Sequence, residues 1–487
     1  MSTFGYSDLI SLDLGKLETA VADWKTMVGA LAKLKADASG GMLKKSEAAR
    51  WQGVNASVTR EFVRNAVKEF ADLHAQAQSV HNVLDDAHSE LTRIQNRVKS
   101  LVRQAAAGNP TRAEPDPGLI VSDAGNGAVR VVSTICDVKG PSQRTEDLIQ
   151  WYADTLTSLV THAAEVDAAA TRALKATHGG DPHNAGHATY TSLDQDQLPR
   201  AMKLAALGDE ANDKQRAEMR RLWQSLSPEG RAQLWLNHRD DLLAGGLLNP
   251  SVKKAAPDRG SGRFDSESPG ADEWLTREKM HLLITGSEWA GSNDAGKHME
   301  HYLGRSGDPL KLPVDRMLAD DENFRGHIDN QIRRHQEGWR EQALEEFHKN
   351  GGRPVAIPIE TDNEDYTFPK NTEPNWFYAV GSTRSNITGV ITVVPDANGQ
   401  PKVGLDYQAN AWDRYNWDAG KGVEIGPVSI PDGEMGRQHV VGHAKEFDMA
   451  GSSSVKHYDL GGSAPNTDPL PQPPDPGRDG GRTDPSR

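Results

Sequence analysis

The stretch Trp412-Asp413-Arg414-Tyr415-Asn416-Trp417-Asp418 sets charged and polar side chains between two tryptophans, and the turn Ala419-Gly420-Lys421-Gly422 follows at once. Aromatic side chains favour burial, whereas the two acids and the arginine need water or a partner. If the stretch is a strand, alternation puts Asp413, Tyr415 and Trp417 on one face and Arg414, Asn416 and Asp418 on the other. Such a pattern suits a substrate cleft, and it equally suits an aromatic cluster with salt-bridged polar residues at the rim of an ordinary sheet.

The segments around this stretch predict an antiparallel sheet preceded by helices. From Arg353 onward, short apolar runs alternate with turn residues such as Asp396-Ala-Asn-Gly399. Residues 274–303 and 314–347 show helical patterning. The sequence therefore predicts an α+β domain over 273–460. Its expected strands are 355–359, 376–380, 390–394, 403–407 and 423–430, and its last helix is expected from Glu434 to Asp448.

Segments of low complexity flank this domain on both sides. Residues 249–272 are rich in Pro, Gly, Ser and charge, and residues 461–487 are rich in Pro, Gly, Asp and Arg. Neither segment carries enough apolar surface to offset the entropy lost on ordering. We therefore expect a linker before the domain and a disordered tail after it.

Residues 1–108 carry two heptad stripes, which predict an antiparallel helical hairpin. Apolar residues three and four apart mark a first helix, Gly40-Gly41 interrupts the pattern, and a longer stripe ends at Gly108-Asn109-Pro110. The stripes consist of Leu14, Leu17, Val21, Trp24, Val28 and Leu31, and of Ala66, Phe70, Leu73, Ala77, Val80, Leu84, Ala87, Leu91, Ile94, Val98 and Leu101.

Residues 109–248 are expected to add a β-hairpin and further helices that dock on the first two. Asn126-Gly127 between apolar runs favours a type I′ turn. A stripe from Tyr152 to Ala170 predicts a third long helix, and Ser227-Pro228 is typical of a helix start. The histidines at 178, 183 and 187 lie among Gly and Pro, where a linker is favoured over a metal loop.

Trp51-Gln52-Gly53 lies between the two heptad helices, close to the glycine break. In that position it resembles the turn of the WXG family, small helical hairpins exported by type VII (ESX) secretion machines. The resemblance covers about residues 10–105 and implies export by that machinery, with a WXG partner or chaperone on the hairpin. The family's Y-x-x-x-[DE] signal is absent after the second helix, and the match Tyr190 to Asp194 comes later. An intracellular coiled-coil or dimerisation hairpin is the alternative.

Charge and composition exclude several classes of function. The net charge of −14 argues against nucleic acid as a general partner, because phosphate binding needs concentrated Lys and Arg. The single cysteine, Cys136, excludes an intramolecular disulfide and a cysteine-based zinc site. We expect no membrane-spanning helix and no Sec signal peptide, because the chain lacks both apolar patterns. The protein is therefore expected to be secreted by another route or to stay in the cytoplasm.

The strands from Tyr378 to Tyr415 resemble the catalytic half of colicin M-type bacteriocins, which cleave lipid-linked peptidoglycan precursor at its pyrophosphate. Asp413 and Tyr415 match the family's Asp-x-Tyr-Asp motif, whereas Asn416 replaces the last aspartate. The family's following His-Arg pair is missing, and Lys421, Arg437 and His439 are the nearby candidates to replace it, although none has the matching spacing. The resemblance implies an antiparallel sheet and a hydrolase.

Cleavage of a pyrophosphate ester needs a carboxylate, a cation and a hydrogen-bond donor. Asp413 and Asp418 are the candidates to hold a divalent ion such as Mg²⁺ or to activate water. Arg414 or Lys421 could stabilise the departing charge, and Tyr415 could orient the phosphoryl oxygens.

His439, His443 and Glu446 are spaced four and three apart on the expected last helix. That spacing would place them on one face, where two imidazoles and a carboxylate could hold zinc with an open fourth position. The alternative is a helix that packs on the sheet with its histidines at the edge of the core. A further group, His298, Glu300 and His301, matches a solvated helix face better than a metal site.

A helical front end, a linker and a distinct α+β domain together resemble polymorphic toxins, in which a constant trafficking region carries an exchangeable toxin. The sequence thus predicts a secreted antibacterial effector that acts on the cell envelope, with a lipid-linked substrate and a cognate immunity protein as partners. A metal-dependent nuclease toxin is disfavoured by the acidity. The alternative to an enzyme is a non-enzymatic scaffold or binding protein. Its binding surface would be lined by Trp376, Phe377, Tyr378, Trp412 and Trp417.

Overall fold

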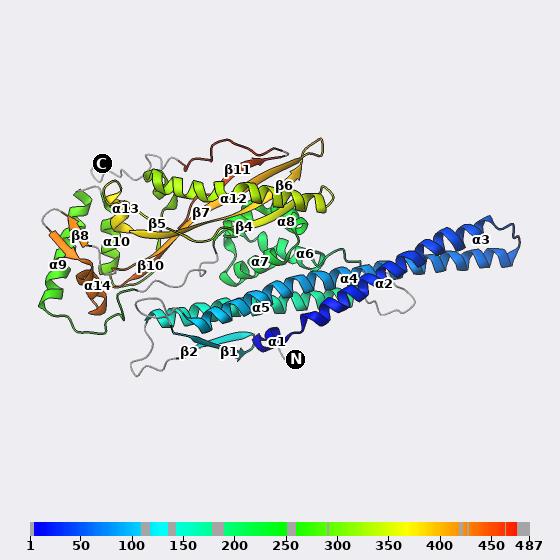
Figure 1. The fold of residues 1–487 in the computed structure, drawn as a ribbon, viewed down its shortest axis with the longest axis horizontal. Coiled ribbons are helices and arrows are strands. Elements are labelled where there is room, and N and C mark those ends of the chain that lie inside the picture. Colours follow the sequence, from blue (N-terminus) through cyan, green and yellow to red (C-terminus); the bar gives the residue numbers. More distant parts are fainter. Residues whose placement is uncertain are drawn as a thin grey trace. The chain divides into compact units, whose positions relative to one another are not determined.

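The chain is mixed α+β, with a long helical N-terminal region and a C-terminal sheet (Figure 1). The computed structural model describes residues 4–108, 117–134, 143–177, 189–250, 260–289, 292–417, 422–425, 428–462 and 464–474. It forms two compact units. One comprises residues 1–134, 152–230 and 236–245, and the other comprises residues 135–151, 231–235 and 246–487. None of the helices in the described ranges is long and apolar enough to cross a membrane.

The first unit is built on two helices that lie side by side (Figure 1). After the short α1 (Tyr6–Ser11), α2 (Leu14–Asp37) leads through a π-helical turn (Ala38–Leu43) and α3 (Lys44–Ala48) into α4 (Val54–Ala107). Trp51-Gln52-Gly53 forms the turn between α3 and α4, and Gly53 caps α4 with φ of 101°. The Arg60 guanidinium holds this turn by donating to the carbonyls of Ser46, Ala49 and Trp51.

The longer heptad stripe is buried only in its C-terminal part. Ala77, Ala87, Leu91, Ile94, Val98 and Leu101 are in the core, whereas Leu73 is exposed. The C-terminal part of α4 contacts α5 as well as α2. The His162 ring of α5 (Gln143–Thr177) lies 3.2 Å from the carboxylate of Glu90, and the Gln76 amide donates to the carbonyl of Thr177. The third helix therefore contacts this part of α4.

The rest of the first unit follows the sequence signals closely. β1 (Leu119–Gly125) and β2 (Ala128–Ser133) pair around Asn126-Gly127, which have φ of 53° and 78° as a type I′ turn requires. The helices α6 (Asp194–Ala205), α7 (Asp213–Ser225) and α8 (Pro228–Ala244) follow, with a 3₁₀ turn at Gly208–Glu210. The hydroxyl of Ser227 caps α8 and Pro228 is its first residue, as expected.

The second unit contains a seven-stranded sheet in the order β3-β10-β7-β6-β4, with β11 also paired to β7 and β5 to β6. All pairings are antiparallel except that of β3 with β10. A separate hairpin is formed by β8 (Gly422–Ile425) and β9 (Val428–Pro431). The sheet strands are β3 (Leu310–Lys311), β4 (Val355–Glu360), β5 (Glu364–Thr367), β6 (Ser382–Pro395), β7 (Pro401–Tyr415), β10 (Phe447–Ser452) and β11 (Lys456–Gly461).

Helix α12 (Glu322–Lys349) crosses one face of this sheet (Figure 1). That face carries the apolar members of the central strands, including Ile387, Leu405 and Ala409, which form one core with Phe324 and Ile332 of the helix. The remaining helices of the unit are α9 (Ala271–Trp289), α10 (Asn293–Leu303), α11 (Val314–Asp320), α13 (Pro374–Ala379) and α14 (Asp432–Val440).

Two expected elements of this unit have a different structure. Residues 376–380 do not form a strand, because Pro374 starts α13 and the Trp376 indole donates to Asp320 at 2.9 Å from inside the core. The last helix ends at Val440 rather than at Asp448. Gly442 follows with φ of 76°, and β10 begins at Phe447.

The expected linker and tail are partly packed on the second unit. Ser261 N–H donates to Glu446 at 2.7 Å and Asp265 N–H donates to the carbonyl of His439, so residues 260–267 lie against α14. In the expected tail, Leu470 is buried in the core and the carbonyl of Asp468 accepts a hydrogen bond from the Tyr458 hydroxyl. Residues 464–474 therefore lie against the sheet through Leu470 and several hydrogen bonds, which differs from the disorder expected there.

Candidate functional site

The face of β6 and β7 opposite α12 carries amide and hydroxyl side chains. Asn386 and Thr388 of β6 lie directly across from Asn410 and Gln408 of β7. A sheet face that bears polar residues is normally solvated. Here all four are at most 6% exposed, and Asn410 is completely buried. This face is therefore a buried polar layer.

The buried layer is tightly hydrogen-bonded. The Asn410 amide nitrogen donates to Asn386 Oδ1 at 3.0 Å and to Thr388 Oγ1 at 2.9 Å, while its oxygen accepts from Gln408 at 3.0 Å and from Ser452 at 2.6 Å. Gln408 also donates to the carbonyl of Leu248 at 3.0 Å. Every hydrogen-bonding position of Asn410 is used, so the layer is held in one arrangement.

A pocket of about 410 Å³ lies over this layer. Its lining combines amide and hydroxyl side chains with the half-buried Trp412 and the exposed Lys311. The Trp412 Nε1–H is buried without a hydrogen-bond partner among the described atoms, although a buried indole N–H normally has one. The lining residues are Asn249, Pro250, Lys311, Glu360, Asn363, Asn386, Gln408, Ala411, Trp412, Ala450, Gly451, Ser452 and Ser453.

Tyr415, expected to be catalytic, lies on the opposite face of β7 from this pocket. It is buried in an aromatic cluster, with its ring stacked on Phe447 at 5.0 Å and edge-on to Tyr302 at 5.6 Å. Burial raises the pKa of its hydroxyl far above the ordinary value, and the hydroxyl has no partner among the described atoms. Asp413 points to the same side of the strand, with Met449 as its cross-strand neighbour. Tyr415 is therefore part of a core and does not line a cleft.

Arg414, on the other side of the strand, is placed in a charged cluster. Its guanidinium lies 3.2 Å from Asp147 and 3.4 Å from Glu446. Glu446 is almost completely buried, and desolvation raises the pKa of its carboxyl despite the nearby Arg414 and the Ser261 N–H. Arg414 thus compensates a buried carboxylate and is held inside the unit.

His439 is in the same cluster, but both of its ring nitrogens are used. Nε2 donates to the carbonyl of Gly262 and Nδ1 accepts from Glu446 N–H, each at 3.1 Å. Burial lowers the pKa of His439 to about 4, so the ring is neutral at pH 7. These bonds leave His439 no lone pair for a metal or a proton transfer.

The expected zinc set is not assembled, because His443 and Glu446 lie beyond the end of α14. The His443 ring packs on Trp274 at 4.4 Å, and its Nδ1 bonds Gln438. Within the described ranges, no group of three or more His, Cys, Asp or Glu side chains is placed to hold a metal ion. Several candidates lie outside the described residues, namely Asp418, Lys421, Cys136 and the histidines at 178, 183 and 187.

The other expected residues have structural positions. His298 is buried and bonds the carbonyl of Ala379 at 2.7 Å, and His301 bonds the carbonyl of Asp308. Glu300 is exposed, as expected for a solvated face, whereas the burial of His298 contradicts that expectation for this histidine. The aromatic surface proposed for a binding protein is only partly present, because Trp376 is in the core while Trp412 lines the pocket.

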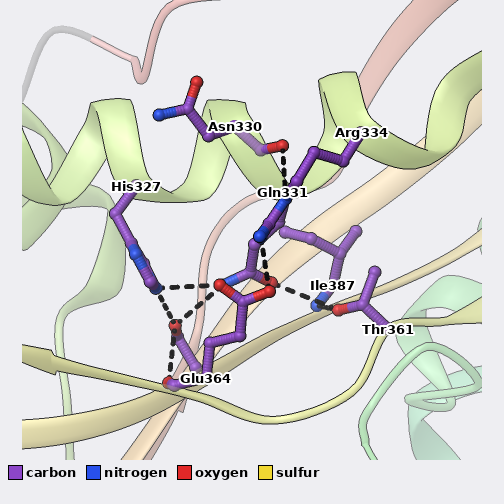
Figure 2. Close-up of polar contacts among 8 residues, drawn as sticks. His327, Asn330, Gln331, Arg334, Thr361, Glu364 and Ile387 are labelled. Atoms are coloured by element: carbon purple, nitrogen blue, oxygen red, sulfur yellow. Dashed lines mark hydrogen bonds and ion pairs between the residues drawn. The ribbon is translucent and has the colours of Figure 1, made fainter.

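A second cavity, of about 480 Å³, lies on the α12 side of the sheet. It is lined by His327, Asn330, Arg333, Arg334 and Glu364, and Arg334 pairs with Glu364. Figure 2 shows that the His327 ring belongs to a series of polar contacts that runs through Gln331 to Thr361.

The donors and acceptors in this series of hydrogen bonds can be assigned from the backbone N–H at one end. Ile387 N–H donates to Thr361 Oγ1, so the Thr361 hydroxyl donates to the Gln331 oxygen, and the Gln331 amide nitrogen faces His327 Nε2 at 3.1 Å (Figure 2). Nε2 therefore accepts and the proton is on Nδ1. The Ser385 hydroxyl, 3.1 Å from Nε2, is completely buried and does not line the cavity. This serine and histidine are consequently not placed as a nucleophile and base for an outside substrate.

The comparisons with known proteins give no relative. No family model, no curated protein and no solved structure matches the chain. The amide-lined pocket is therefore assigned as the candidate site on its own geometry.

Proposed function

We propose that the chain is a secreted effector whose C-terminal unit binds a glycan of the bacterial cell envelope in the amide-lined pocket. The observation that carries this proposal is the buried layer of Asn386, Gln408 and Asn410 beneath a pocket walled by Trp412. Such a layer is costly for a chain that needs only stability, because apolar residues would fill the same space without polar desolvation. Ligand binding is a reason to keep it.

The chemistry of the lining favours an uncharged, hydroxyl-rich ligand. Amide and hydroxyl groups offer both donors and acceptors, and an indole provides a flat apolar wall against which a sugar ring can pack. The charged groups are few, with Glu360 and Lys311 in the lining. A nucleotide or polyphosphate would need several cations converging on it. A saccharide of one or two rings is therefore the best match in size and polarity.

Delivery to the envelope is proposed from the helical front end. Trp51-Gln52-Gly53 at the turn between helices supports a WXG-type module, and with it export by a type VII machine and a WXG partner or chaperone. These proposals rest on the resemblance over about residues 10–105, and the cognate immunity protein rests on the resemblance to polymorphic toxins.

Hydrolysis of the lipid-linked precursor is the reading that we favour less. It would require Tyr415 to orient a phosphoryl group, yet that hydroxyl is enclosed by aromatic rings. Binding needs only the groups that line the pocket. We therefore prefer a glycan-binding role over a catalytic one.

Titration of the full chain with purified, solubilised peptidoglycan fragments tests this proposal. Trp412→Ala is expected to weaken binding roughly tenfold or more, as loss of a central indole does in other recognition sites. Trp274→Ala is the matched control, because it removes a half-exposed indole that does not line the pocket. Far-UV circular dichroism checks that both variants are folded. Equal affinity of the two variants for the fragments, or no affinity in the unaltered chain, would refute the proposal.

A further inference from the structure

The outer end of the helical hairpin exposes large apolar side chains. We call residues 25–68 the hairpin tip. Trp51 is 56% exposed, Val54 79%, Val58 60% and Phe62 69%, and Met27, Leu34 and Met42 are also exposed. Single exposed apolar residues are ordinary, but a group of this kind on one short segment marks an interaction surface.

The exposed apolar residues at the start of α4 form one face, opposite the side that packs inside the hairpin. Val54, Val58 and Phe62 are four residues apart, so they lie along one side of the helix. Ala56 and Val63, which are buried, lie about 150° around the helix from that side at 100° per residue. The returning segment of the hairpin, made of α2, the π-helical turn and α3, packs on α4 and covers the side of Ala56 and Val63. Within the described residues, the face of Val54, Val58 and Phe62 remains open.

The tip has the opposite charge from the rest of the chain. It carries nine Lys or Arg against three Asp or Glu, hence +6, in a chain whose net charge is −14. Most of these basic side chains are exposed, whereas Arg60 is used to bond the turn and Arg64 pairs with Glu47 at 3.6 Å. The basic residues are Lys25, Lys33, Lys35, Lys44, Lys45, Arg50, Arg60, Arg64 and Lys68.

We infer that the hairpin tip docks on an anionic phospholipid surface. The two features call for a partner that is negatively charged and also takes up apolar side chains. A bilayer with anionic headgroups offers both, because lysines bind its surface while Trp, Phe and Val enter the boundary between headgroups and acyl chains. A nucleic acid offers the charge, but it gains little from Val54, Val58 and Met42. An acidic protein groove is the remaining competitor, and the experiment separates it.

The docking should be reversible and sensitive to salt. Neither the apolar group nor the charge alone gives stable attachment, because one weak anchor yields only marginal membrane binding. The electrostatic part is screened within about 10 Å at 0.1 M salt. The inference does not depend on the glycan pocket, which is built from a different part of the chain.

Flotation of the full chain with lipid vesicles tests the inference. Vesicles of phosphatidylcholine alone are compared with vesicles that contain one third phosphatidylglycerol, at low and at high salt. We expect the chain to float with the anionic vesicles at low salt and to dissociate at high salt, with little binding to the neutral ones. Equal binding to both kinds of vesicle, or none to either, overturns the inference. If the chain binds neither kind of vesicle and instead self-associates through the tip, this face is a protein-binding surface.

Variants localise the effect. Lys44→Glu with Lys45→Glu should weaken partitioning roughly 30-fold or more, because each basic residue near the surface contributes about fivefold and the two losses multiply. Val58→Ser with Phe62→Ser should also weaken it, since both side chains are exposed and their loss spares the fold. Leu282→Ser is the matched control, being a 64% exposed leucine on α9. Circular dichroism confirms retained helix. Unchanged flotation of both tip variants, or an equal loss in the Leu282 control, counts against the assignment.

Discussion

Trp412 and Tyr415 lie three residues apart on β7 and face opposite sides of the sheet. The side of Tyr415 is an aromatic core with Phe447 and Tyr302, and the side of Trp412 is a pocket floored by amides. Two aromatic residues of one short sequence stretch therefore have different surroundings, one in a core and the other at a candidate site. Whether such a residue can contact a ligand depends on which face of the strand apolar partners cover.

The buried hydroxyl of Tyr415 gives a direct test of its role. It has no hydrogen-bond partner among the described atoms, so Tyr415→Phe removes a desolvated polar group without creating a cavity. We expect the free energy of unfolding to stay the same or rise by up to about 1 kcal/mol, with glycan binding unchanged. Denaturant unfolding and the binding titration measure the two quantities. A folded variant that has lost function would restore the tyrosine to a catalytic role.

Alternation along β7 could be predicted from the sequence, but the identity of the site could not. The strand reading of residues 412–415 correctly puts Asp413 and Tyr415 opposite Arg414. The signal for the polar layer was also present, since Gln408 and Asn410 alternate with the apolar Tyr407 and Ala409. Such alternation usually means a solvated face. Only the packed structure reveals that this face is buried and hollowed.

The secondary structure that is wrongly predicted from the sequence belongs to short segments, because tertiary contacts decide whether they become helix or strand. Trp376-Phe-Tyr-Ala-Val has strong strand propensity, yet it is helical because Pro374 starts a helix and the Trp376 indole reaches Asp320. Long patterned segments, such as α4 and α12, can be predicted from the sequence because many residues repeat the signal. Helix α14 ends at Val440 and Gly442 follows with φ of 76°, although the sequence around it still has a helical pattern.

The connection from α14 to β10 should make the second unit sensitive to acid. His439 joins three segments through Gly262, Glu446 and its own helix, and burial lowers its pKa to about 4 from an unfolded value near 6.5. A lowered pKa stabilises the fold above pH 6.5, and that stability is lost as pH falls from 6.5 through 4. The loss should be on the order of 2 kcal/mol after allowance for solvent screening. Thermal unfolding across this range measures it.

A variant isolates this contribution from the other titrating groups. Glu446 acts in the opposite sense, because its raised pKa means that protonation at low pH favours the fold. His162, in the first unit, also has its pKa lowered to about 4 by burial. His439→Gln should therefore lower stability at pH 7 and flatten the decline between pH 6.5 and 4. A decline as steep as that of the unaltered chain would show that His439 does not contribute to it.

At the scale of the whole molecule, the order of elements could be predicted but the strand order could not. Helices followed by a sheet after residue 273 were evident from composition and periodicity. The long β7 pairs with β6 on one side and with both β10 and β11 on the other, and this depends on contacts between strands far apart in sequence. The pocket is formed where these strands meet residues 249 and 250, so its lining could not be assembled from local patterns.

The proposed glycan ligand predicts where the full chain affects a bacterial cell. Peptidoglycan lies outside the inner membrane, so growth of a Gram-negative host should slow when the chain carries a periplasmic leader and continue when it remains in the cytoplasm. Trp412→Ala should relieve the periplasmic effect and Trp274→Ala should not, with equal amounts of protein confirmed by immunoblot. Arrest confined to the cytoplasmic form would instead indicate a target such as a nucleic acid or nucleotide. In that case the cavity beside His327, with Arg333 and Arg334, would be the site to examine, because its cations suit a phosphate better than the amide pocket does.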